Sequence, residues 1–243
     1  MSDDSSERIA KVLARRGVAS RREVERMIAA GRITVNGKLL NTPAVKVSER
    51  DRITVDGQVI GVAEALRIWR YNKPAGLVTS ERDELGRKTI FDALPDKLPR
   101  VVTVGRLDLN SEGLLLLTND GGVKRLLELP STGWTRKYRV RVHGTPQDTQ
   151  LAPLRKGITV DGEDFLGMNV QIDRQQGANA WLTVALKEGK NREIRRAMDY
   201  IGLRVNRLIR VSYGPFQLGD LDSGEIKELS NRAIRDQLGK IVE

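Results

Sequence analysis

The first sixty residues carry two kinds of hydrophobic pattern. Apolar residues recur at helical spacing over 8–16 and again over 20–31, with a glycine at the end of each segment. Two short β-like runs follow at 33–35 and 53–55, and an Asn-Gly or Asp-Gly dipeptide comes directly after each. Such dipeptides are strong signals for tight hairpin turns. The pattern predicts a small α/β module over 8–60.

From residue 67 onward the pattern changes to many strands and a few helices. Strands are predicted at 67–71, 101–104, 114–118, 137–142, 165–172, 180–186 and 208–211. Helices are predicted at 123–129, 148–154, 192–201 and 231–238, the last two capped by Asn191 and Ser230. Because helices and strands do not strictly alternate, we expect an α+β domain over 67–243 on a mixed, mainly antiparallel sheet. Residues 61–66 read as a linker and the polar residues 1–7 as a disordered leader.

Composition narrows the chemistry. Lysine and arginine number 42 against 32 acids, a net charge of +10, which favours nucleic acid as a partner and an anionic membrane less. The chain has no cysteine and one histidine, so thiolate nucleophiles, Cys-ligated metals and His-based triads are excluded within one chain. No stretch is apolar enough to span a bilayer and no secretory signal is present. We expect a cytoplasmic protein that uses no metal and no cofactor.

Basic residues crowd the two helices of the first module. Between Arg8 and Arg32 there are eight basic residues and two acids. A solvated helical face would give the same count. The segment 19–37, however, resembles the core of the S-four-like RNA-binding module, named after a protein of the small ribosomal subunit. That resemblance implies that five arginines near the helix junction contact RNA phosphates: Arg15, Arg16, Arg21, Arg22 and Arg26.

The most informative stretch is Gly105–Gly113, which precedes four consecutive leucines. It places the carboxylate of Asp108 close to Arg106, just ahead of a run that can only be core. Taken alone, an Arg-Leu-Asp tripeptide is more often a turn before a strand. The whole string resembles the signature of the RsuA/RluB-type pseudouridine synthases, which convert uridine in ribosomal RNA to pseudouridine.

Three further segments match the same family in the expected order. Residues 71–79 resemble its first motif, 136–142 the strand that carries its active-site tyrosine, and 187–196 its third motif. The resemblance runs over nearly the whole chain, and the combination of motifs is far more specific than any single one. Residues 92–95 and 204–214 are most similar to the RluB branch, which modifies large-subunit (23S) rRNA.

The resemblance implies roles for individual residues. Asp108 would be the catalytic carboxylate, Arg195 would pair with it and keep it ionised, and Tyr138 would stack on a flipped-out uracil. Further RNA contacts would come from Lys73, Arg106, Arg192 and Arg196, and the three arginines of the third motif are expected on one helical face. Whether Asp108 attacks C1′ or deprotonates C2′ is left open, as is the uridine that is modified.

The net charge alone is also compatible with other functions. A small-subunit (16S) rRNA enzyme of the same family, or a non-catalytic RNA-binding or ribosome-assembly factor, would carry the same net charge. A pure binder has no need for the trio Asp108, Tyr138 and Arg195. A methyltransferase ranks lower, because no glycine-rich loop opens a helix and cysteine is missing. We expect a monomer that acts on free rRNA or on an assembling particle.

Overall fold

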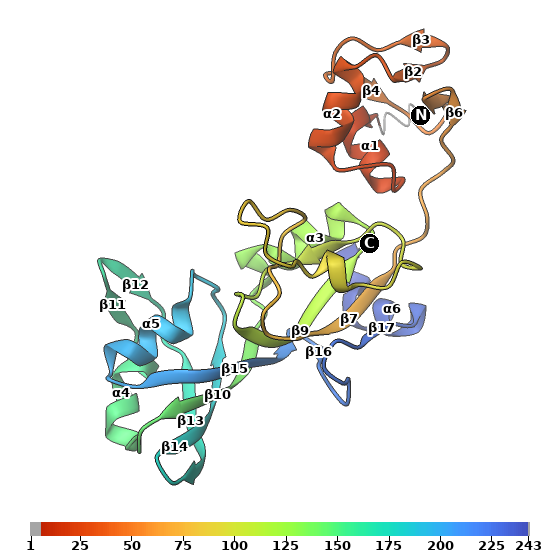
Figure 1. Ribbon diagram of the computed structural model, residues 1–243. Coiled ribbons are helices and arrows are strands. Elements are labelled where there is room, and N and C mark those ends of the chain that lie inside the picture. Colours follow the sequence, from red (N-terminus) through yellow and green to blue (C-terminus); the bar gives the residue numbers. More distant parts are fainter. Residues whose placement is uncertain (1–5, 243) are drawn as a thin grey trace. The chain divides into compact units, whose positions relative to one another are not determined.

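The computed structural model describes residues 6–242, and they fall into two compact units (Figure 1). The first unit takes in the chain up to Arg67 together with 96–102 and 118–123, and the second takes in the remaining residues. The first contains β1 (Glu7–Arg8), α1 (Ile9–Arg15), α2 (Arg21–Ala29), β2 (Ile33–Val35), β3 (Lys38–Leu39), β4 (Lys46–Val47), β5 (Ile53–Val55) and β6 (Gln58–Val59).

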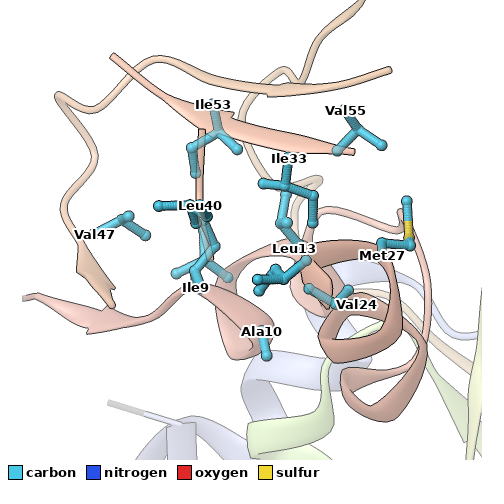
Figure 2. Close-up of a cluster of buried hydrophobic side chains, with 12 residues drawn as sticks. Ile9, Ala10, Leu13, Val24, Met27, Ile33, Leu40, Val47, Ile53 and Val55 are labelled. Carbon is cyan, nitrogen blue, oxygen red and sulfur yellow. The ribbon is translucent and has the colours of Figure 1, made fainter. Parts of the chain in front are cut away.

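Two helices and a four-stranded sheet share the core of the first unit. The strands lie in the order β3-β2-β5-β6, and both predicted hairpins are confirmed. Asn36 and Asp56 open the two turns with φ of 51° and 49°, the left-handed backbone that this turn type requires. Figure 2 shows the apolar side chains that α1, α2 and the strands direct inward, among them Leu13 and Ile33, which are fully buried.

The predicted leader is too long by at least one residue. Residues 1–5 lie outside the described part of the chain, but Glu7 pairs with Val47 in the β1–β4 ladder. Its carboxylate also binds Lys11 and Arg15 of α1. A glutamate that begins the fold and neutralises two helix cations belongs to the module.

The second unit is built on one large sheet. Its strands are β7 (Ile68–Lys73), β8 (Val102–Val104), β9 (Ser111–Thr118), β10 (Arg136–His143), β11 (Ile158–Val160), β12 (Glu163–Phe165), β13 (Asn169–Gln176), β14 (Asn179–Leu186), β15 (Arg204–Tyr213), β16 (Phe216–Gln217) and β17 (Ile226–Glu228). Its helices are α3 (Gly121–Glu128), α4 (Asp148–Lys156), α5 (Glu193–Tyr200) and α6 (Asn231–Val242), with short 3-10 turns at Phe91–Ala93 and Pro130–Thr132.

The large sheet is mixed and mainly antiparallel, which confirms the predicted α+β class. Among the described residues it has nine strands in the order β13-β14-β10-β15-β9-β7-β17, with β16 on β15 and β8 on β9. The β15–β9 pair is parallel. Helices α4 and α5 pack against β13 and β15, on the face that carries Val140 and Leu182.

One predicted strand is wrong. The run 165–172 is divided in the structure: its start closes the β11–β12 hairpin and its end opens β13. The hairpin turns at Asp161-Gly162, with φ of 51° and 77°, another Asp-Gly signal. The sequence did not predict β13 as a separate strand. Its residues are mostly exposed and polar, so they do not alternate between apolar and polar side chains.

A glycine lets β9 and β15 approach each other. Gly113 has a φ of +97°, and a Cβ there would lie 2.3 Å from the carbonyl oxygen of Arg210. Both atoms belong to the parallel ladder that joins the two halves of the sheet. Only a residue without a side chain fits at this position.

We therefore expect Gly113→Ala to lower the free energy of unfolding by about 3 kcal/mol or more, because backbone must shift to relieve the overlap. Gly121→Ala is the matched control, since a Cβ there meets no atom within 4 Å and its φ is ordinary. Thermal unfolding of both variants beside the native chain measures the difference. Equal melting temperatures for the two variants would contradict the close approach.

Candidate active site

Asp108 lies at the wall of a cleft of about 520 Å³ in the second unit. The cleft is also lined by Arg106, Tyr138, Arg192 and Arg210, which come from four separate segments of the chain. The Asp108 side chain is about one-third exposed. Two residues that the sequence predicts to be catalytic, Asp108 and Tyr138, thus share one cleft.

The loop that carries Asp108 is built around a buried ammonium group. Lys73 is fully buried, and its Nζ donates to the carbonyl oxygens of Pro74 (2.9 Å), Asp108 (3.3 Å), Leu109 (3.3 Å) and Ser111 (2.9 Å). Burial lowers the pKa of Lys73 to about 8, while the charges of Asp108 and Glu112 raise it. The prediction that Lys73 contacts RNA is wrong, because its ammonium is buried and already bound by four backbone carbonyls.

Two further contacts fix the same loop. The Thr79 hydroxyl donates to the Leu107 carbonyl at 2.7 Å, and the Gly76 amide donates to the Leu109 carbonyl at 2.8 Å. The residues on both sides of Asp108 are therefore held by the first family-like motif, 71–79. This explains why two segments thirty residues apart match the family together.

The cation nearest Asp108 is Arg192. Its Nη1 lies 3.8 Å from Oδ2 of Asp108, and both side chains are partly exposed. Arg195, the predicted partner, instead donates to the carbonyls of Asn110 (3.0 Å) and Val205 (3.2 Å). Its charge still acts on the site, since Asp108 raises the pKa of Arg195 against the larger lowering effects of burial and of Arg192. The predicted Arg195–Asp108 ion pair is replaced by an Arg192–Asp108 pair.

Arg192 reaches Asp108 because it lies outside the helix. Its φ of 48° puts it in the left-handed region at the N-terminus of α5, where the sequence predicted a cap at Asn191 and three arginines on one helical face. A non-glycine residue in this region is uncommon and is held there by its surroundings. Arg136 anchors the preceding loop by donating to the Lys187 carbonyl at 2.6 Å.

Two glutamates, Glu188 and Glu193, stabilise the same loop through hydrogen bonds and an ion pair. Glu193 is buried and accepts from the Lys190 amide at 3.0 Å, while Glu188 accepts from the Leu166 amide at 2.5 Å and pairs with Lys190 at 3.2 Å. Burial and the neighbouring Glu188 together raise the pKa of Glu193 to about 7, against the lowering effect of the Lys190 amide. One Glu193 oxygen has no donor among the described residues, and we expect a proton shared with Glu188 to complete the pair.

The remaining wall of the cleft is aromatic and basic. Tyr138 is mostly buried on β10, and Arg210 on β15 donates from Nε to the Leu114 carbonyl at 2.7 Å. Nη2 of Arg210 is buried and has no partner within the described residues. Its guanidinium lies 5.2 Å from the ring centre of Tyr213, which in turn donates to the Leu127 carbonyl.

Arg106, another predicted RNA-binding residue, is exposed and lines the same cleft as Asp108. Arg196 points away, to Glu163 at 2.5 Å and over the ring of Phe165 at 4.8 Å. The five arginines of the first unit are exposed or partly exposed on or beside α1 and α2, where Arg15 pairs with Glu7 and Arg26 with Glu23.

One site residue was missed and another was given the wrong role, although the sequence contains a signal for each. Lys73 shares its phase with Trp69 and Tyr71 along β7, and all three are buried. Arg210 shares its phase with Leu208 along β15 in the same way. A charged residue at a buried phase of a strand is expensive unless it has partners, so it indicates a structural or functional site.

The described residues offer no group of side chains suited to bind a metal ion. Across residues 6–242 there is no cluster of three His, Asp or Glu side chains that could hold a metal ion. Over the same residues, no helix is long and apolar enough to cross a membrane.

Comparison with known proteins identifies the family. Residues 67–200 match the sequence model of the RNA pseudouridylate synthases, and residues 7–53 match that of the S4 domain. An uncharacterized RNA pseudouridine synthase of Rickettsia prowazekii is 43% identical over 95% of this chain and 97% of its own length. The ribosomal large subunit pseudouridine synthase B of Escherichia coli O157:H7 is 41% identical over 88% of this chain and 76% of its own.

A solved structure agrees in fold. The crystal structure of a pseudouridylate synthase superposes with a TM-score of 0.68 at 24% identity, over 95% of this chain and 99% of that one. The chain belongs to the RNA pseudouridylate synthase family, of the type that carries an N-terminal S4 domain.

The Glu188–Glu193 pair predicts a pH-dependent stability. A carboxyl whose pKa is higher in the folded chain than its ordinary 4.5 contributes stability below that ordinary value, and loses it as the pH rises through about 7. We expect the native chain to lose melting temperature between pH 5 and pH 8 and Glu193→Gln to lose a few degrees less, because an amide does not titrate and still donates to Glu188. Equal pH slopes in both proteins would exclude the shared proton. Glu25→Gln, which changes an exposed carboxyl on α2, is the control.

Proposed function

We propose that this pseudouridine synthase isomerises one uridine of large-subunit (23S) rRNA, with Asp108 as the catalytic carboxylate. The assignment to 23S rRNA rests on relatives named ribosomal large subunit pseudouridine synthase B, which are 41–42% identical to this chain. The alternative within the family is a uridine of 16S rRNA. The proposal includes a monomeric, cytoplasmic enzyme without metal or cofactor, acting on free rRNA or on an assembling particle.

The proposal rests on one observation: Asp108 differs from the other carboxylates of the cleft in its hydrogen bonding. Glu128 accepts from the Gly105 amide and binds Lys124, and Glu193 accepts from the Lys190 amide. Within residues 6–242, no donor binds the Asp108 carboxylate, which makes only the long ion pair with Arg192. It is the lining carboxylate whose oxygens remain free to attack or to take a proton.

The reaction accounts for the other parts of the cleft. The bond from C1′ of the ribose to N1 of uracil breaks, the base turns, and C1′ bonds to C5 with loss of the C5 proton. C5 loses a proton and N1 of the uracil gains one, so the reaction is an isomerisation with no net oxidation or reduction. Tyr138 offers a ring on which the flipped uracil stacks, and Arg192 and Arg195 place positive charge beside Asp108.

The division of labour between modules completes the proposal. Residues 8–60 act as an RNA-binding domain, 61–66 as a linker and 67–243 as the catalytic domain. In the first, Arg16, Arg21 and Arg22 make no ion pair among the described residues, so their guanidinium groups are available to RNA phosphates. This module supplies affinity, and the cleft supplies the chemistry.

We predict that Asp108→Asn abolishes turnover, by at least about a thousandfold, while changing RNA affinity less than about threefold. The amide keeps the shape of the carboxylate but cannot act as an anion. Chemical mapping of pseudouridine in rRNA from cells that lack the gene, complemented with native protein or with the variant, measures activity and locates the uridine. Turnover by pure Asp108→Asn would overturn its role, and a modified uridine in 16S rRNA would select the alternative substrate.

A further inference from the structure

Where the large sheet is formed by β10 and β14, the residues that alternate with the buried ones make up a second face. Tyr138, Val140 and Val142 of β10 point to the cleft and the core, so their neighbours along the strand point the other way. Those neighbours are Lys137, Arg139, Arg141 and His143, and all four are exposed. Strand β14 contributes Trp181, Thr183 and Ala185 to the same face, each of them half-buried.

The register places arginines around Trp181. Arg141 of β10 is its direct partner on one side and Arg174 of β13 on the other. The guanidinium carbon of Arg139, one pair further along, lies 4.8 Å from the centre of the indole ring. Three arginines from two neighbouring strands therefore surround one aromatic ring on an open sheet face.

The positive charge of this face is not neutralised locally. Arg139, Arg141 and Arg174 make no ion pair among the described residues. Two acids lie nearby: Glu112 is paired with Arg207 at 2.7 Å, and Asp173 accepts from the Thr183 hydroxyl at 2.9 Å, a neutral donor that leaves its charge in place. The three arginines outnumber that carboxylate, so the face keeps an excess of positive charge that favours an anionic partner.

We propose that this face, defined by Lys137, Arg139, Arg141, Arg174 and Trp181, binds a part of the substrate RNA remote from the modified uridine. The inference rests on the proposed action on rRNA. The residues concerned point away from Asp108, so they cannot contact the reacting nucleotide. They can hold an RNA segment that flanks it.

The chemistry of the face fits RNA better than other polyanions. Fork-shaped guanidinium groups bind phosphates in pairs, and an indole ring flanked by cations stacks on an unpaired base. An acidic protein surface would use the charges but not the ring. A membrane surface would require exposed apolar side chains that insert, whereas the exposed residues of β10 on this face are Lys137, Arg139, Arg141 and His143.

Two RNA lengths test the proposal. The double variant Arg141→Ala/Arg174→Ala and the single variant Trp181→Ala are compared with native protein on a long transcript around the modified uridine and on a short stem-loop cut from it. We expect about tenfold weaker binding of the long RNA, a salt dependence reduced by about two charges in the double variant, and unchanged turnover of the stem-loop. The control variant Arg232→Ala/Arg235→Ala removes the same charge from α6. It should change neither the affinity for the long RNA nor the turnover of the stem-loop.

The outcomes separate this inference from the proposed function. Absence of turnover on both RNAs by native protein would refute the function, whereas normal turnover with unchanged long-RNA affinity in both variants would refute the second surface alone. Quenching of tryptophan fluorescence by a single-stranded 20-mer, lost in Trp181→Phe, provides a readout that needs no activity. If polyglutamate quenches Trp181 and RNA does not, the face binds an acidic protein and the proposal is wrong.

Discussion

The candidate active site depends on one buried ammonium group. Lys73 donates to the carbonyls of Asp108, Leu109 and Ser111 and to that of Pro74 at its own strand end, so a single charge replaces the regular hydrogen bonds that a loop cannot make. An unpaired carbonyl in a buried loop costs about 1–3 kcal/mol, and a buried lysine without acceptors costs more. The buried ammonium and the loop carbonyls therefore satisfy each other's hydrogen bonds. These bonds connect the end of β7 to the start of β9.

The second element of the site is the loop before α5, which brings Arg192 to Asp108. Its left-handed backbone at Arg192 is maintained by Arg136 on one side and by the Glu188–Glu193 pair on the other. Positive charge reaches Asp108 through this loop rather than from the helix itself. Among the described residues, the arrangement leaves the carboxylate free of tight hydrogen bonds, as a nucleophile or base requires.

Sequence reasoning recovered what depends on local patterns. The paired helices and hairpins of the first unit follow from spacing and turn dipeptides, and Asp108 and Tyr138 follow from the resemblance of their motifs. The partner of Asp108 did not follow, because helical spacing assumes that Arg192 is helical and only tertiary contacts hold it at a φ of 48°. The resemblance of the first motif suggested an RNA contact for Lys73, although its phase along β7 indicated burial.

The central claim, that the Lys73 ammonium positions Asp108, is tested most directly by single-turnover kinetics of Lys73→Met at saturating RNA, well below the variant's melting temperature. Methionine fills the same space and donates no hydrogen bond. The account predicts a rate at least about a hundredfold lower with RNA affinity nearly unchanged, because the cleft persists while the carboxylate loses its place. A folded variant with a near-native rate would show that Asp108 is held by other contacts and would contradict the account.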